Sequence, residues 1–198
     1  MSWLITILVL VALAAVVVVL VRRAQRAQQA QQSRASEPVD PFRADPRGIS
    51  ARSIGVGAVV TYEGGDWVVR GTLELEEDGF TWHEHHLDDA TTRRWLSVED
   101  DEELEVCLWE KILAPELEPG PPTLEHAGVT YTLDEHGRAH YRATGTTGTP
   151  PEGAVEYYDY VDRRQRLSFE RYGGEGWEVS IGRVVDEHEL DIYPAPSG

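Results

Sequence analysis

The chain has 198 residues with 18 basic and 35 acidic side chains, which gives a formal charge of −17. The charge is unevenly distributed: residues 22–52 hold seven arginines, whereas residues 55–198 hold 11 basic and 32 acidic groups. Such a negative field repels phosphate backbones, so we expect no nucleic-acid partner. The single cysteine, Cys107, excludes an internal disulfide and a Cys-rich zinc module, and it suits a reducing compartment.

Residues 1–21 are predicted to form a transmembrane helix. Positions 3–21 contain no charged side chain, and at about 1.5 Å per residue they just span a hydrocarbon core of roughly 30 Å. A cleaved signal peptide is the alternative. It is disfavoured because nothing basic precedes the apolar run, the run is long, and no A-x-A site follows it.

The arginines that follow this segment set the predicted orientation. Arg22, Arg23 and Arg26 lie directly after the apolar run, so the positive-inside rule places the N-terminus outside and the rest of the chain in the cytoplasm. We therefore predict a single-pass protein of the plasma membrane, in contact with the bilayer through residues 3–21. The same arginines could also attract anionic head groups.

Residues 22–52 are expected to form a basic juxtamembrane extension of the helix and then a flexible linker. Residues 24–35 are good helix formers without an apolar stripe, and Pro38, Pro41 and Pro46 end any helix.

A first β lobe is predicted over residues 53–114. Short runs of β-branched and aromatic residues are separated by turn residues, which is typical of antiparallel strands. The expected strands cover residues 58–62, 66–76, 80–87, 93–99 and 104–112. Five twisted strands joined by such short turns favour a small SH3-like roll or barrel.

A second β lobe is predicted over residues 123–194, after a Pro-rich connector at 115–122 and before a tail at 195–198. Its expected strands include residues 129–137 and, as a separate strand, residues 138–145, and the set is expected to form a β-meander. The fold class is thus mainly β, with two small antiparallel lobes behind one transmembrane helix. The tryptophans on these strands are expected to lie chiefly in the core.

The sequence WHEHHLDD, at residues 82–89, is the most site-like stretch of the chain. On a strand, His83 and His85 would share one face, while Trp82, Glu84 and His86 would share the other. Weak candidates for a metal site are His83 and His85 with further ligands from His136, His140 or His126. The alternatives are histidines on a half-solvated strand, or a cluster whose pKa values are raised by surrounding carboxylates.

Other catalytic chemistry has little support in the sequence. Cys107 lies in the apolar run VCLWE and is expected to be a packed, unreactive side chain. Neither a G-x-S-x-G elbow nor a phosphate-binding loop is present, and Lys111 is the only lysine. Carboxylates are so numerous that a catalytic pair cannot be selected among them. We therefore predict a protein that is not an enzyme and uses no cofactor.

Two groups of strand motifs carry a resemblance to a known family. The first group lies in FTWHEHHL and RRWLSVE, and it comprises Trp82, Glu84, Leu87, Trp95, Leu96 and Glu99. The second lies in EYYDYVD, LSFERY and WEVSIGRVV, and it comprises Asp159, Tyr160, Glu170, Ser180 and Gly182. From about Gly57 to Tyr193 the chain resembles the bacterial family called domain of unknown function 4178.

The resemblance implies a β-rich module without assigned catalytic residues. Family members are associated with membrane proteins, polyamine synthase-like enzymes and phage-shock-type envelope-stress proteins, which implies an accessory role at the membrane. We therefore expect a non-enzymatic interaction module, tethered at the inner face of a bacterial plasma membrane, with an unidentified membrane or cytosolic protein partner. A domain that binds cations or polyamines is the alternative, and a metal-dependent enzyme comes third.

Overall fold

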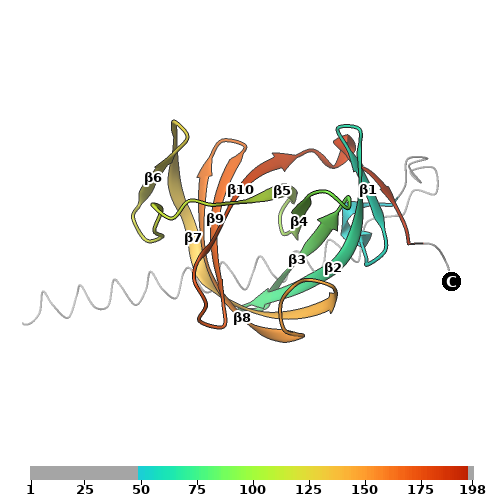
Figure 1. Ribbon diagram of the computed structural model, residues 1–198, viewed down its shortest axis with the longest axis horizontal. Helices are drawn as coiled ribbons and strands as arrows, with labels where there is room; N and C mark the ends of the chain where they lie inside the picture. The colour runs from blue at the N-terminus through green and yellow to red at the C-terminus, as the bar shows by residue number, and fades with distance from the viewer. Residues whose placement is uncertain (1–48, 196–198) are drawn as a thin grey trace, which may run out of the picture. The chain divides into compact units, whose positions relative to one another are not determined.

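The computed structural model describes residues 49–195, which form strands joined by turns, with two short 3-10 helices (Figure 1). The strands are β1 (Val59–Tyr62), β2 (Gly65–Glu77), β3 (Phe80–Asp88), β4 (Arg93–Asp100), β5 (Leu104–Ile112), β6 (Thr123–His126), β7 (Val129–Gly145), β8 (Glu152–Asp162), β9 (Gln165–Tyr172), β10 (Glu178–Val185) and β11 (Asp191–Tyr193). The 3-10 helices are η1 (Ala51–Ser53) and η2 (Glu187–Glu189). The prediction of a mainly β fold is confirmed.

All eleven strands belong to one antiparallel sheet in the order β11-β1-β2-β3-β4-β5-β10-β9-β8-β7-β6. A further pairing joins β2 to β7, so the eight strands from β2 to β7 in this order close into a barrel. Figure 1 shows β1 on one side of this barrel and the hairpin of β6 and β7 on the other. Within residues 49–195, no helix has the length and apolar character needed to cross a membrane.

Tight turns explain why consecutive strands pair as hairpins. Glu63 and Gly64, Asp78 and Gly79, and Ala127 and Gly128 all have positive φ angles. Two successive residues of this kind form the turn whose twist matches that of paired strands. The short connections predicted between the first three strands are therefore confirmed.

A bulge at Arg70 gives β2 two different roles. The register with β3 shifts between Val69 and Gly71. Before the bulge, Trp67 and Val69 pack with Leu87 in one apolar cluster, and after it Leu73 pairs with Glu84 on the other face of β3. Because bulges increase strand twist, one long strand can thus line two cores.

Two apolar clusters lie on the outer side of the barrel wall. The first contains Val60, Trp67, Leu87 and Leu96, and β11 completes it with Ile192. The second surrounds Tyr160, Leu167 and Phe169 and includes residues from the connector after β5, such as Ala114. Neither cluster corresponds to one predicted lobe, because the first includes Val185 and Ile192 and the second includes Ile112 and Ala114.

The two-lobe architecture itself is wrong, because strands from both halves of the chain pair with each other. Six residue pairs join β2 to β7, and seven pairs join β5 to β10. The C-terminal β11 also returns to pair with β1. The predicted division into strands 129–137 and 138–145 is absent: β7 continues from Val129 to Gly145, with an irregularity between Leu133 and Glu135.

Glycines make the closing contact between β2 and β7 possible. Gly71 and Gly145 face each other at one end of this ladder. A Cβ atom on Gly71 would lie 2.5 Å from the carbonyl oxygen of Thr146, and one on Gly145 would lie 2.5 Å from that of Arg70. Gly145 also has a φ of +75°, which side chains rarely adopt. The strands can approach this closely only because neither residue carries a side chain.

We predict that Gly71→Ala lowers the free energy of unfolding by about 1–3 kcal/mol, because the added methyl group meets backbone atoms that cannot move aside. Urea denaturation of the full chain in detergent micelles measures this change. Gly176→Ala is the matched control, since nothing lies within 4 Å of its Cβ position. Equal stability of the two variants would contradict the closing role of Gly71.

Candidate functional site

The inner face of the barrel is formed by alternate residues of all eight strands. The register places Glu84 between Leu73 of β2 and Ser97 of β4, and it places Asp159 opposite Ser168 of β9. The residues on this face include Leu75, Trp82, Trp95, Glu99, Cys107, Trp109, Ala139, Tyr141, Val155, Tyr157, Glu170, Tyr172 and Gly182. The interior of the barrel is therefore a mixture of rings and acids.

Four of these side chains are carboxyl groups that meet inside the barrel. They come from four strands: Glu84 from β3, Glu99 from β4, Asp159 from β8 and Glu170 from β9. All four are surrounded by protein, and each keeps a limited accessible surface. Solvent thus reaches them in part, although they lie inside the closed sheet.

Aromatic rings surround these acids. Trp82 of β3 contacts Tyr157 of β8 edge to face, with 6.1 Å between ring centroids. Tyr141 of β7 contacts Tyr172 of β9 at 5.4 Å in the same geometry. The ring N–H of Trp82 donates to Glu84 at 3.4 Å, so the rings supply polar contacts as well as apolar walls.

Burial raises the pKa of each of the four carboxyl groups, because a charged form loses water that the protein does not replace. The pKa rises to about 7 for Glu84 and Asp159, and to about 8 for Glu99. For Glu170 the pKa lies well above the usual value. Clusters of this kind are more frequent at functional sites than elsewhere, although structural networks produce them too.

The four groups also act on one another. The charge of Asp159 raises the pKa of Glu84 and of Glu99, and the charge of Glu170 raises that of Asp159. Glu84 in turn raises the pKa of Glu170. Because each ionisation hinders the next, the titrations of these four carboxyls depend on one another.

Hydrogen bonds and cations offset this repulsion only in part. Ser168 lowers the pKa of Asp159 by hydrogen bonding, and the Tyr172 hydroxyl donates to Glu170 at 3.2 Å. Arg166 has a smaller lowering effect on Glu99. That arginine already holds Glu105 through two nitrogens of its guanidinium group, at 2.9 to 3.2 Å.

Chemically, this interior can hold protons near neutral pH or accept a cation between acids and rings. Aromatic faces attract ammonium groups, and carboxylates supply the matching charge. Cys107 lies on the same face, but burial raises the pKa of its thiol, which makes it a poor nucleophile. Its predicted role as a packed, unreactive side chain agrees with its 1% exposure.

The glycine at position 182 makes room for a large ring in this interior. A Cβ atom there would lie 2.5 Å from the Trp109 ring and 2.8 Å from the Cys107 sulfur. The Trp109 ring N–H donates to the Ser97 hydroxyl at 2.9 Å. This packing explains the position of Gly182 in the motif noted in the sequence.

The histidines at positions 83 and 85 share one face of β3, as predicted, and this face is the outer side of the barrel. Their rings stack with 6.2 Å between centroids. His83 lies 3.8 Å from Glu74, and Nδ1 of His85 lies 3.0 Å from the Thr72 hydroxyl. Burial lowers the pKa of His85 to about 3, so the predicted rise in pKa is wrong for this residue.

The other weak metal candidates lie on different strands. His136 of β7 stacks on Tyr158, and His140 of β7 pairs with Glu76 of β2, while His126 is in β6. Among the residues that the structure describes, no group of three or more His, Cys, Asp or Glu side chains has an arrangement suited to a metal ion. The predicted metal set is therefore not assembled in that part of the chain.

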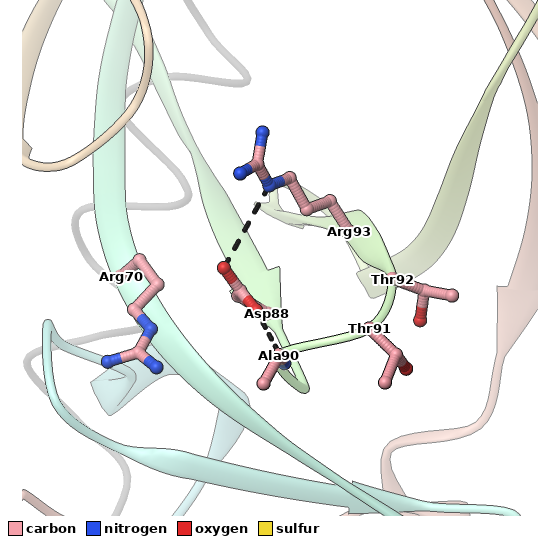
Figure 2. A pocket seen from close by; sticks show the side chains of 6 residues that line it. All are labelled: Arg70, Asp88, Ala90, Thr91, Thr92 and Arg93. Carbon is pink, nitrogen blue, oxygen red and sulfur yellow. Dashed lines mark hydrogen bonds and ion pairs between the residues drawn. The ribbon is translucent and has the colours of Figure 1, made fainter.

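A surface hollow lies at the turn between β3 and β4 and is lined by Arg70, Asp88, Ala90, Thr91, Thr92 and Arg93 (Figure 2). One Asp88 oxygen accepts from the Ala90 N–H at 2.6 Å, and the other lies 3.9 Å from Arg93. Asp89 accepts from Thr91 and Thr92, and these bonds lower its pKa to about 2. The polar groups of this hollow thus mainly stabilise the turn.

Sequence reasoning singled out the histidines and missed the acids of the interior. Glu84, Glu99, Asp159 and Glu170 were visible only as positions of a family pattern, among many solvated carboxylates. Their common signal is a position on the same strand face as a tryptophan or tyrosine, as for Glu84 beside Trp82. Which strands face each other across the barrel could not be derived without the closing pair.

Known relatives are similar over most of the chain. An uncharacterized protein of Mycobacterium bovis (strain ATCC BAA-935 / AF2122/97) is 41% identical over 170 residues, covering 78% of this chain and 81% of the relative. The uncharacterized protein Rv2597 of Mycobacterium tuberculosis (strain ATCC 25618 / H37Rv) matches with the same identity and coverage. No solved structure matches the chain significantly.

The family assignment rests on residues 55–187, which match the family described as domain of unknown function DUF4178. This range contains the four interior carboxyls and the tryptophans around them. The chain belongs to this family, the DUF4178 domain family.

Proposed function

We propose that the protein is a non-enzymatic accessory module, tethered at the inner face of a bacterial plasma membrane and docking onto a membrane or cytosolic protein. The observation that carries this proposal is the uncharged segment at residues 3–21, followed directly by Arg22, Arg23 and Arg26. These residues lie outside the described part of the chain. Tethering would raise the effective concentration of the barrel near a membrane partner.

The tether predicts that the full chain stays in the membrane fraction after an alkaline wash and that deletion of residues 2–21 releases it. A fluorescent protein fused to the C-terminus should fluoresce, because that fusion lies in the cytoplasm. A fusion to alkaline phosphatase at the same point is the matched control and should stay inactive. Active phosphatase would overturn the proposed orientation.

The docking role predicts partner capture that depends on the barrel and not on the apolar segment. Replacement of residues 3–21 by an unrelated single-pass helix should keep a membrane neighbour among the proteins crosslinked in cells. Gly71→Ala, which weakens barrel closure, should reduce that capture at equal expression. If the membrane neighbour is no longer crosslinked once residues 3–21 are replaced, the barrel is not the recognition element.

A second candidate function is the binding of polyamines or similar organic cations inside the barrel. The observation that favours it is the convergence of Glu84, Glu99, Asp159 and Glu170 among aromatic rings, in a folded part with a formal charge near −21. A chain of ammonium groups could replace the missing counter-charges there. The general acidity of the surface would also raise the local concentration of such cations.

Cation binding predicts that spermidine raises the thermal midpoint of the full chain in detergent micelles. At a spermidine concentration 100 times the dissociation constant, the free energy of unfolding rises by about 2.7 kcal/mol. For a chain of this size, that gain raises the thermal midpoint by roughly 5–10 °C. The double variant Glu84→Gln, Asp159→Asn should lose the response, whereas Glu116→Gln, Glu118→Gln should keep it. Those two control residues are exposed.

Magnesium at matched ionic strength distinguishes binding from screening. A midpoint shift with magnesium equal to that with spermidine, or a full response in the interior variant, would contradict the cation site.

A further inference from the structure

The carboxyls of the interior lie on opposite walls of the closed sheet. Glu84 and Glu99 belong to the neighbouring strands β3 and β4, whereas Asp159 and Glu170 belong to the neighbouring strands β8 and β9. Around the ring, β5 and β10 separate the two pairs of strands on one side, and β2 and β7 separate them on the other. Repulsion between these pairs therefore acts across the barrel. Such a repulsion opposes closure of the barrel as a whole, because it acts between strands that are not neighbours in the sheet.

Every strand of the barrel contributes titratable or charged groups to this inner face. They are Glu77 of β2; Glu84, His86 and Asp88 of β3; Arg93 and Glu99 of β4; Glu105, Cys107 and Lys111 of β5; Glu178 of β10; Arg166, Glu170 and Tyr172 of β9; Tyr157 and Asp159 of β8; and Glu135 and Tyr141 of β7, with Asp134 beside it. Acids thus greatly outnumber bases on this face.

The three permanent cations of this face already hold other acids. Arg166 binds Glu105, Lys111 lies 2.5 Å from Glu178, and Arg93 lies 3.9 Å from Asp88. Within the residues that the structure describes, no ion pair joins a cation to the four central carboxyls. A buried carboxylate without a counter-charge is unstable relative to its protonated form.

We propose that the barrel interior is a proton-operated switch, in which Glu84, Glu99, Asp159 and Glu170 share protons while the barrel is closed and loosen the β2–β7 seam when they lose them. This seam joins β2 to β7 through six residue pairs and is one of the eight ladders that close the ring. At one end of the seam the Glu77 carboxylate accepts from the Tyr157 hydroxyl and from the Arg138 N–H.

The sign of the pH dependence follows from the raised pKa values of the interior. Burial holds the pKa of Glu84 and Asp159 at about 7 and that of Glu99 at about 8, whereas an unfolded chain has carboxyl pKa values near 4. Between these limits the folded state binds more protons than the unfolded state. The contribution of these groups to the free energy of unfolding is therefore fully present below about pH 4. It is lost as the pH rises through about 7 to 8.

The test is the thermal midpoint of the full chain in detergent micelles, followed by tryptophan fluorescence from pH 5.5 to 8.5. We expect the midpoint to fall by roughly 5–10 °C over this range. Glu84→Gln, Asp159→Asn should remove at least half of the fall, because the amides cannot ionise. The control Glu116→Gln, Glu118→Gln removes the same number of carboxyl groups at exposed positions and should leave the fall unchanged.

Infrared spectroscopy of the wild-type chain gives an independent readout that does not require a folded variant. Protonated carboxyl groups should be visible at pH 6.5 and should decrease by pH 9, and the amides of β2 and β7 should lose protection relative to their intrinsic exchange rates at each pH. A midpoint that stays level or rises between pH 5.5 and 8.5 would overturn the switch. Absence of protonated carboxyl groups at pH 6.5 would overturn it as well.

Discussion

The pairing of β2 with β7 is the contact on which the rest of this structure depends. It joins residues about 70 positions apart in the chain, from Gly71 with Gly145 to Glu76 with His140. Without this ladder the eight strands would not enclose an interior. With it, the inner faces of eight strands enclose a common interior, and acids that are distant in sequence become neighbours. Two opposed glycines allow the backbones to approach.

The enclosed interior is an unusual core, because it combines aromatic packing with groups that resist dehydration. Leu73, Leu75 and Ala139 are fully buried, as in an ordinary core. The carboxyls beside them remain tolerable because protonation, weak hydrogen bonds and partial solvent access each reduce the penalty of burial. Further apolar packing lies in the two outer clusters around Leu87 and Phe169.

The positions that carry the family pattern acquire a common physical role in this arrangement. Trp82, Glu84, Trp95, Glu99 and Asp159 all lie on the inner face, whereas Leu87, Leu96 and Tyr160 lie in the outer clusters. The pattern thus contains both the groups that line the interior and the residues that hold its walls. By contrast, His83 and His85 face outward. The proposed cation and proton chemistry therefore belongs to the interior and not to these histidines.

The sequence by itself determined the strands, their turns and the alternation of side chains, because these depend on local propensity and on a period of two. It predicted β5 at residues 104–112 without error, and it separated the faces of β3 correctly. Local pattern also missed the continuity of β7, since a strand that bends can contain residues typical of turns. Only the tertiary structure decided that Glu84 and Glu99 meet Asp159 and Glu170. That meeting depends on which strands pair across 70 residues, and neither the propensity of a segment nor its hydrophobic period encodes this long-range choice.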